Sequence, residues 1–328
     1  MSVDTVAPTP ERVGWKDLTW IAWRQHRAVL MSTGVFVVGV AVMMAVLGIV
    51  LASHGSTDVS ILTFQSPIPP AEMLAMGVTG YAGLVAAFWA APLLSREYEQ
   101  RTHMLVWSQD VSAARWVAGK AVALVSVAVA FALVLGIVGN LMAGSLEDST
   151  AQLRYFSRFD ELFFGMAPLV QVGYVLFGFA LGLAVSAITR RTVLSIGLTA
   201  GIFFVVRVVI AQLVRPYYQT PERITSSIDE RGVGISSTND RSLQVESGLL
   251  DGAGNTMEYP AQCYNTSFSG IDGFTDCLRA NGAVGNFRDF QPIERLETFQ
   301  YIEFGVFTAL AVVLFVVTNR VMRRVTRL

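Results

Sequence analysis

The residues best able to carry function lie together between positions 95 and 120. Glu97 and Glu99 stand two positions apart and are followed by Arg101. An apolar run comes next, made of Met104, Leu105, Val106 and Trp107. Charged side chains fix the register of a protein contact, and apolar side chains supply area that a partner buries. We therefore interpret this segment as a protein-docking element.

The sequence lacks the common motifs of hydrolases and nucleotide-binding enzymes. It contains no H-E-x-x-H and no G-x-S-x-G, and Gly119-Lys120 lacks both the upstream glycine and the following Ser or Thr of a phosphate-binding loop. The histidines, at 26, 54 and 103, are too scattered to indicate a metal site. We expect no catalytic residue, no metal and no cofactor in this chain, so any ATP and Mg²⁺ would be bound by a partner subunit.

The elements that carry this segment are membrane-spanning helices. Hydrophobic residues make up 53% of the 328 residues and charged residues only 15%. Four stretches contain no Asp, Glu, Lys, Arg or His: 28–53, 73–95, 121–146 and 162–189. Each is longer than the roughly 20 residues that cross a bilayer core. Two further spans, 192–214 and 299–319, each carry one charge, Arg207 and Glu303. The sequence thus predicts an all-α polytopic membrane protein with six transmembrane helices.

The basic residues predict how these spans are oriented. If both termini are cytoplasmic, the inner segments 1–27, 95–120, 189–191 and 319–328 hold 14 Lys or Arg and 6 Asp or Glu. The outer segments then hold 9 basic and 19 acidic residues. An excess of Lys and Arg marks cytoplasmic segments. We therefore expect a multi-pass membrane protein with both termini on the cytoplasmic side.

The same reading divides the chain into four regions. Residues 1–27 form a cytoplasmic tail whose part from Trp15 to Arg27 is expected to lie along the membrane surface as an interfacial helix, with an ordinary flank of the first span as the alternative. Residues 28–214 hold spans one to five, with the docking segment at 95–120. An extracytoplasmic cap occupies 215–294, and 295–328 holds span six and a basic tail.

The cap is expected to have a thin core, because only 27 of its 80 residues are hydrophobic. Both cysteines of the chain, Cys263 and Cys277, lie in it. On the oxidising side of a membrane such a pair predicts a disulfide, and two free thiols are the alternative. Closing a loop of this size stabilises a fold by roughly 3 kcal/mol.

Two features concern the packing of the spans. Small residues recur at helical spacing in span two (Gly83, Ala87, Ala91) and span four (Gly178, Gly182, Ser186), which predicts close helix packing within the bundle or at a dimer seam.

Arg207 and Glu303 are expected at the same depth in the membrane. Arg207 lies 16 residues from Arg191 and Glu303 lies 17 residues from Arg320, which is about 24 and 26 Å along a helix from the cytoplasmic ends of their spans. An unpaired charge in a membrane is costly, so we expect an Arg207–Glu303 ion pair. The alternative is that each side chain reaches the outer surface separately.

The 95–120 segment resembles the permease subunits of type-2 ATP-binding-cassette exporters. That family carries E-x-E-x-G-T after its second span, then a coupling helix, then Gly-Lys before the third span. Here Glu97, Glu99 and Thr102 are in register, Arg101 stands where glycine is usual, and Gly119-Lys120 follows. The opening Trp-Ile-Ala-Trp-Arg-Gln-His-Arg at 20–27 is similar to the connecting helix of such permeases in high-GC Gram-positive bacteria.

The resemblance implies a location, the bacterial cell membrane, and a function. Two permease subunits, either a homodimer or a pair of similar chains, would enclose a pathway in the membrane lipid, and two cytoplasmic ABC ATPase subunits would dock beneath them. The ATPase-coupling residues would be Glu97, Glu99, Arg101, Thr102, Met104, Leu105 and Trp107. Apolar span faces favour an amphipathic or hydrophobic substrate, such as an antibiotic, a peptide or a lipid, moved outward.

Other classes of function are less well supported. Spans one to four contain no carboxylate for a proton-coupled carrier, and no ring of charge indicates a channel. The outer segments show no basic patch with interleaved aromatic residues, so no nucleic-acid partner is expected. The remaining alternative is a membrane assembly or signalling subunit with the outer insert as a binding module. Co-purification with an ATPase would distinguish it from an exporter.

Overall fold

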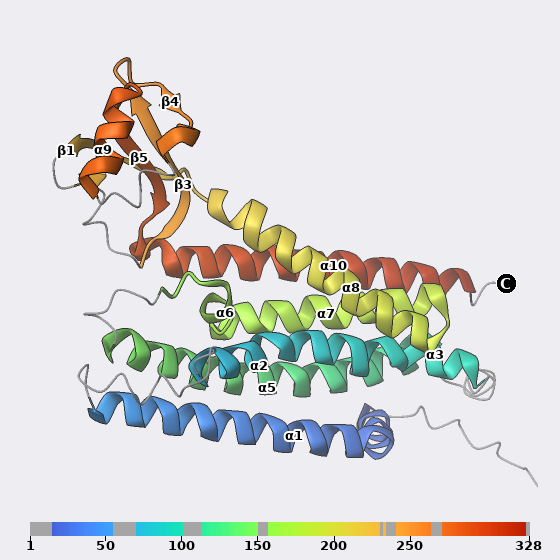
Figure 1. The fold of residues 1–328 in the computed structure, drawn as a ribbon. Coiled ribbons are helices and arrows are strands. Elements are labelled where there is room, and N and C mark those ends of the chain that lie inside the picture. The colour runs from blue at the N-terminus through green and yellow to red at the C-terminus, as the bar shows by residue number, and fades with distance from the viewer. Residues whose placement is uncertain are drawn as a thin grey trace, which may run out of the picture.

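Long helices dominate the computed structural model, which describes residues 15–54, 70–100, 113–149, 157–229, 232–233, 241–263 and 271–325. Six helical stretches in these ranges are long and apolar enough to cross a membrane, as the sequence predicts: Trp23–Ser53, Pro70–Glu99, Trp116–Asp148, Pro168–Thr189, Thr192–Tyr217 and Ile293–Arg323. They run side by side as one bundle, and a small sheet stands at one end of it (Figure 1). We call that end the cap end and the opposite end, where α3 stops, the α3 end.

The helices are not all regular. They comprise α1 (Trp15–His54), α2 (Pro70–Val85), η3 (Ala86–Ala90), α3 (Ala91–Glu99), α5 (Ala113–Ser149), α6 (Glu161–Phe164), α7 (Pro168–Thr189), α8 (Thr192–Val209), η4 (Ile210–Val214), η5 (Arg215–Tyr217), α9 (Ile271–Ala280), η7 (Ile293–Arg295) and α10 (Leu296–Val325). Two of them, η3 and η4, are single π-helical turns inside spans two and five. Such turns are often found at functional sites. Each shifts the helix face that the following residues present.

The helix α7 forms the centre of the bundle. It contacts α2, α3, α5, α8 and α10, and it is the most buried of the six spans. Its residues are apolar on every side, as expected for a helix with neighbours all round. By contrast, α1, α8 and α10 present broad apolar faces that no other described residue covers.

Small residues let α7 approach span two closely. A Cβ added at Gly182 would lie 2.6 Å from Ala90 Cβ and 2.7 Å from Ala86 O. At Gly178 the added atom would lie 3.0 Å from Ala86 Cβ. The small-residue stripe of span four therefore packs within the chain, against α2 and η3. This is the first of the two roles that the spacing predicts.

The N-terminal helix is joined to span one without a loop, because α1 is continuous from Trp15 to His54. Figure 1 shows the first turns of α1 nearly end-on, whereas span one runs along the bundle, so α1 bends between them. Trp20 and Trp23 are more than half exposed, and the Arg24 guanidinium lies 5.2 Å from the centre of the Trp20 ring. The placement of this segment at a membrane surface stays a prediction.

The cap contains a sheet, so the all-α fold class is correct only for the spans. Its strands are β1 (Glu222–Asp229), β2 (Gly232–Val233), β3 (Leu243–Asp251), β4 (Thr256–Met257) and β5 (Ala283–Gln291), in the order β2-β1-β5-β3-β4. All neighbours are antiparallel. Because β1 pairs with β5 across more than fifty intervening residues, local composition gives little sign of the sheet.

The predicted Cys263–Cys277 disulfide is confirmed. It joins α9 to the segment before it and lies in a core of five buried residues, with Ile228, Leu249, Leu278 and Ala283. This core is much smaller than that of the helical bundle, so the cap depends on its covalent crosslink.

Candidate functional site

The last turn of α3 is the described beginning of the predicted coupling segment. Pro92 lies in the first turn of this short helix, directly after the π-helical turn η3. The helix ends at Glu99, and Gln100 donates its N–H to Arg96 O. Glu97, Tyr98 and Glu99 thus project from a fixed turn at the α3 end.

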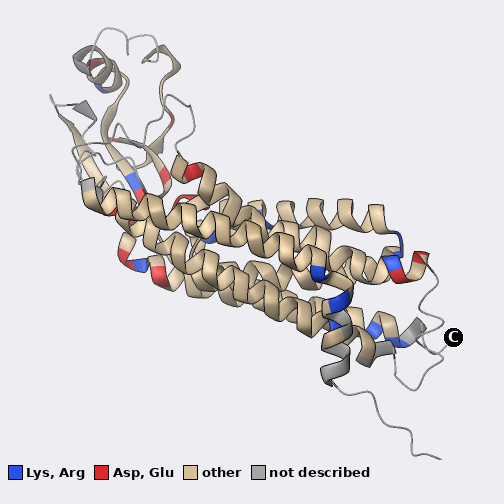
Figure 2. Ribbon diagram, turned by 90° about the horizontal axis from the view of Figure 1, so that it is seen from below, with Lys and Arg blue, Asp and Glu red and all other residues tan. Residues whose placement is uncertain are grey.

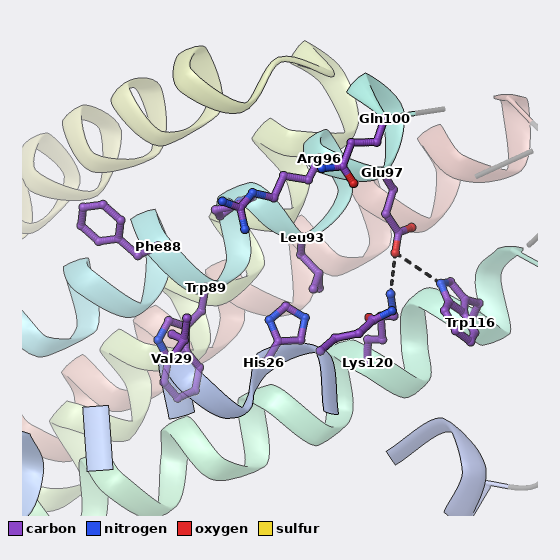
Figure 3. A pocket seen from close by; sticks show the side chains of 12 residues that line it. His26, Val29, Phe88, Trp89, Leu93, Arg96, Glu97, Gln100, Trp116 and Lys120 are labelled. Atoms are coloured by element: carbon purple, nitrogen blue, oxygen red, sulfur yellow. Dashed lines mark hydrogen bonds and ion pairs between the residues drawn. The ribbon is translucent and has the colours of Figure 1, made fainter. Parts of the chain in front are cut away.

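Glu97 ties α3 to α5. Its carboxylate accepts a hydrogen bond from Lys120 Nζ at 2.5 Å and one from Trp116 Nε1 at 3.4 Å (Figure 3). Lys120 Nζ also lies 4.4 Å from the centre of the Trp116 ring. The lysine side chain is only 6% exposed, so its charge depends on Glu97. The Gly-Lys pair noted in the sequence therefore holds the start of span three to the end of span two.

Glu99 ties α3 to α8. Its two oxygens accept hydrogen bonds from Thr192 N at 2.9 Å and Thr192 Oγ1 at 2.7 Å. The first N–H groups of a helix have no partner within it, and the helix dipole favours an anion there. Beside it, the Arg190 guanidinium lies 5.2 Å from the centre of the Tyr98 ring. Arg190 caps α7 in a left-handed conformation, with a φ of 55°.

One short helix end thus contacts three other spans. We call Glu97, Tyr98, Glu99, Lys120, Arg190 and Thr192 the α3 clamp. Of the predicted coupling residues, the structure places Glu97 and Glu99 in this clamp. Arg101, Thr102, Met104, Leu105 and Trp107 lie outside the described residues.

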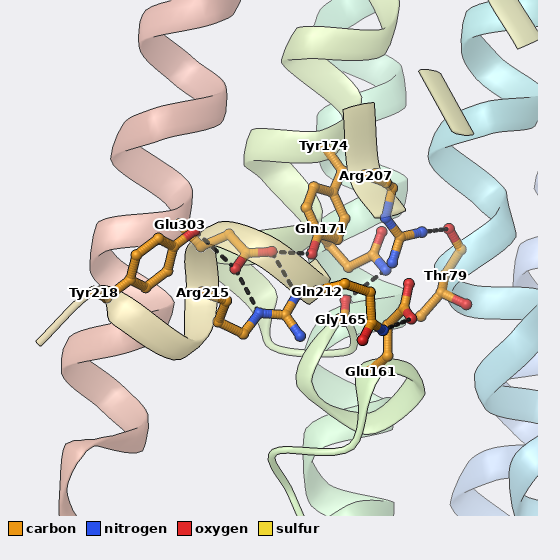
Figure 4. Close-up of polar contacts among 10 residues, drawn as sticks. All are labelled: Thr79, Glu161, Gly165, Gln171, Tyr174, Arg207, Gln212, Arg215, Tyr218 and Glu303. Carbon is orange, nitrogen blue, oxygen red and sulfur yellow. Dashed lines mark hydrogen bonds and ion pairs between the residues drawn. The ribbon is translucent and has the colours of Figure 1, made fainter. Parts of the chain in front are cut away.

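A second polar cluster lies inside the bundle near the cap end. Glu303 of α10 accepts two hydrogen bonds from Arg215, from Nε at 2.8 Å and from Nη2 at 2.7 Å (Figure 4). Tyr174 and Tyr218 donate their hydroxyls to the same carboxylate. The side chains of Arg215 and Glu303 are 3% and 1% exposed. This bidentate pair, satisfied by two phenols, joins the end of span five to span six.

The predicted Arg207–Glu303 ion pair is wrong, because Glu303 pairs with Arg215 and not with Arg207. Arg207 instead donates Nη1 to Thr79 O at 3.0 Å, and its guanidinium lies 4.3 Å from the centre of the Tyr174 ring. Tyr174 stands between the two charges, so they do lie at similar depth, but Glu303 is bound by Arg215. The predicted span five ended at residue 214, which placed Arg215 in the cap, whereas η4 and η5 continue span five and turn Arg215 into the bundle.

The sequence contained a partial signal for this cluster. Arg215 is the first charged residue after span five, and Tyr174 and Gln171 are polar residues within span four. Gln171 is fully buried and donates its amide to Val78 O and Gly165 O. A polar residue in the middle of an apolar span indicates a partner on another helix.

Comparison with known proteins identifies the family of the chain. No curated protein matches it. The profile of one protein family, described as ABC-2 membrane transporter related, matches residues 52–215. The match covers half of the chain and includes all of spans two to four, the α3 clamp and span five up to Arg215. Together with six apolar helices, it identifies a multi-pass membrane transporter permease, a transmembrane component that is not itself the ATPase. The chain belongs to the ABC-2 membrane transporter related family.

Proposed function

We propose that this chain is the permease subunit of an ATP-driven exporter that moves an amphipathic or hydrophobic substrate outward. A separate cytoplasmic ABC ATPase binds ATP and Mg²⁺ and hydrolyses the ATP. The residues from Glu97 through Trp107 form the contact through which that ATPase moves the spans.

The α3 clamp is the observation that carries this proposal. A force applied at the end of α3 reaches α5 through the Glu97–Lys120 pair and α8 through the hydrogen bonds between Glu99 and Thr192. Rigid contacts of this kind couple one element to others as a unit. A solvated linker would need no such attachment. The predicted apolar run, with Met104, Leu105 and Trp107, directly follows the clamp in the sequence.

Charge supports placing the α3 end in the cytoplasm. Figure 2 shows blue basic residues gathered toward the α3 end and most red acidic residues toward the cap end. Arg24, Arg96 and Arg190 lie at the α3 end, and Arg320 and Arg323 lie in the last turns of α10. Basic residues near span ends favour the cytoplasmic side. The disulfide-bonded cap then lies outside, where disulfides persist.

The exposed faces support a dimer of permeases. On α1, Val35, Val38 and Val42 are all more than half exposed, and Phe204 and Val205 are similarly exposed on α8. Membrane lipid covers such surfaces, and a second permease copy, identical or similar, covers part of them. We propose an assembly of two permeases with two ATPase subunits.

Isolation of the tagged chain from gently solubilised membranes tests this function. We expect an ABC ATPase to be recovered in equal number to the permease, at two copies of each by native mass spectrometry. Repeated isolation of the folded chain without any ATPase would contradict the proposal and favour an assembly or signalling subunit. A protein with an unrelated six-span bundle, tagged in the same host, is the control for non-specific recovery.

A further inference from the structure

Two adjoining cavities form one groove between α1 and the span made of α2, η3 and α3. The first, of about 350 Å³, lies at the α3 end and is lined by polar side chains, among them His26, Arg96, Gln100 and Lys120 (Figure 3). The second, of about 290 Å³, lies deeper in the bundle and is almost entirely apolar. Val29, Phe88 and Trp89 line both cavities, so the two adjoin. We call them together the α1–α3 groove.

The polar half of the groove offers a cation. Glu97 is bound to Lys120 and Trp116, so this carboxylate and this ammonium largely neutralise each other. Arg96 forms no ion pair with any other described residue and is exposed. In Figure 3 its guanidinium extends away from Glu97, toward Phe88. His26, from α1, adds a ring N–H on the opposite wall.

The apolar half is open toward the side of the bundle. Phe36, Leu84 and Phe88 are 43%, 49% and 58% exposed, and all three line it. Tyr81 lines the deep end, is only 1% exposed and donates its hydroxyl to Ala128 O, so it adds no unpaired polar group there. Phe88 and Trp89 belong to the π-helical turn η3. Phe88 points outward, and Trp89, which is 5% exposed, points inward.

The length of the groove matches one leaflet of a bilayer. Arg96 and Tyr81 are 15 residues apart on one span, which is about 22 Å along a helix. Half of a hydrocarbon core is about 15 Å, and the headgroup region adds the rest. A cation at the water-facing end and an apolar channel that opens sideways are complementary to an anionic lipid.

We propose that the α1–α3 groove binds an anionic glycerophospholipid from the leaflet at the α3 end. The lipid phosphate lies between Arg96 and His26, and one acyl chain follows the wall from Phe88 to Tyr81. The lipid then bridges α1 to the span that carries the α3 clamp. This inference uses the membrane location of the chain and does not depend on an ATPase partner.

Native mass spectrometry of the purified chain in detergent tests the site, with phosphatidylglycerol and phosphatidylcholine of identical acyl chains as probes. We expect phosphatidylglycerol to bind about fivefold more tightly, the factor that one cation near an anionic lipid supplies. Arg96→Gln should abolish this preference, and Arg96→Lys should retain most of it. Arg24→Gln, which removes a cation outside the groove, should leave the preference unchanged.

A second variant tests the acyl-chain half. Thr33 lines the apolar cavity, so Thr33→Trp should fill it and reduce binding of both lipids. Val38→Trp places the same bulk on the exposed face of α1, outside the groove, and should bind as the wild type does. Equal binding of the two lipids to the wild type would overturn the proposal. So would a preference that survives Arg96→Gln, or binding unchanged by Thr33→Trp. Because no ATPase is present, none of these results bears on the exporter function.

Discussion

Glu303 joins span six to the end of span five and to span four inside the bundle. Its carboxylate is buried and accepts hydrogen bonds from Arg215, Tyr174 and Tyr218. A buried ion pair contributes little net stability compared with apolar residues of the same size, but removal of one partner leaves an uncompensated charge. The cluster therefore specifies how span five ends against span six.

Glu303→Ala should destabilise the bundle by about 3–5 kcal/mol, because it leaves Arg215 charged and unpaired. Thermal unfolding in detergent measures this loss. Glu297→Ala, an exposed change on the same helix, should stay within about 0.5 kcal/mol of the wild type. In charge-swapped pairs, Arg215→Glu with Glu303→Arg should recover more stability than Arg207→Glu with Glu303→Arg. The reverse order of recovery would show that Arg207 is the partner.

At the scale of elements, α7 contacts most of the other long helices, and its glycines determine how closely span two packs against it. The position of Gly182 has no space for a side chain, since an added Cβ would meet both a side chain and backbone atoms of η3. Movement at this contact also shifts α3 and its clamp, because α3 continues from η3 in one span.

Gly182→Val should destabilise the bundle by about 1–3 kcal/mol through overpacking. It should also lower the amount of ABC ATPase that is isolated together with the chain, relative to the wild type. Gly197→Ala is the matched control, since nothing lies within 4 Å of its added Cβ and alanine favours a helix. Thermal unfolding of the two variants in the same detergent makes the comparison. A tolerated Gly182→Val would mean that α7 and span two are farther apart than described.

The stability of the cap should depend on pH through one cross-strand pair. Arg223 of β1 lies opposite Asp289 of β5 and holds the pKa of that carboxyl below its usual value. A lowered pKa contributes stability that is present above the usual carboxyl pKa, about 4, and is lost as the pH falls through the lowered value. Hydrogen exchange of the β5 amides should therefore speed up below about pH 4, after correction for intrinsic rates, more in the wild type than in Asp289→Asn. Equal acceleration in both proteins would exclude this pair as the cause.

The sequence predicted those elements whose signal is local. Charge-free runs indicate the six spans, and two cysteines in one insert indicate the disulfide. The cap sheet could not be predicted in this way, because Glu222 pairs with Phe290 far along the chain, beyond β3, β4 and α9, and the strands are rich in polar residues. Glu303 was recognised as needing a cation, but the choice between Arg207 and Arg215 depended on the π-helical turn η4, which no residue pattern marks.

At the scale of the whole molecule, the two polar clusters lie at opposite ends of one helical bundle. The α3 clamp joins spans two, three, four and five at one end, and the Arg215–Glu303 cluster joins spans four, five and six near the other. Spans four and five take part in both. A displacement that begins at α3 can therefore reach the cap end through packed helices, as an exporter driven from one side requires.

The coupling claim is tested most directly by the rate of ATP hydrolysis in the complex recovered with this chain. Met104→Ala, Leu105→Ala and Trp107→Ala are combined in one variant. Its control carries Val312→Ala, Val313→Ala and Val316→Ala, which remove apolar surface from the exposed face of α10. We predict that the first variant folds with an unchanged melting temperature but loses the ATPase, or loses the stimulation of hydrolysis by the permease, while the control keeps both. Normal recovery and normal hydrolysis in the first variant would contradict the account.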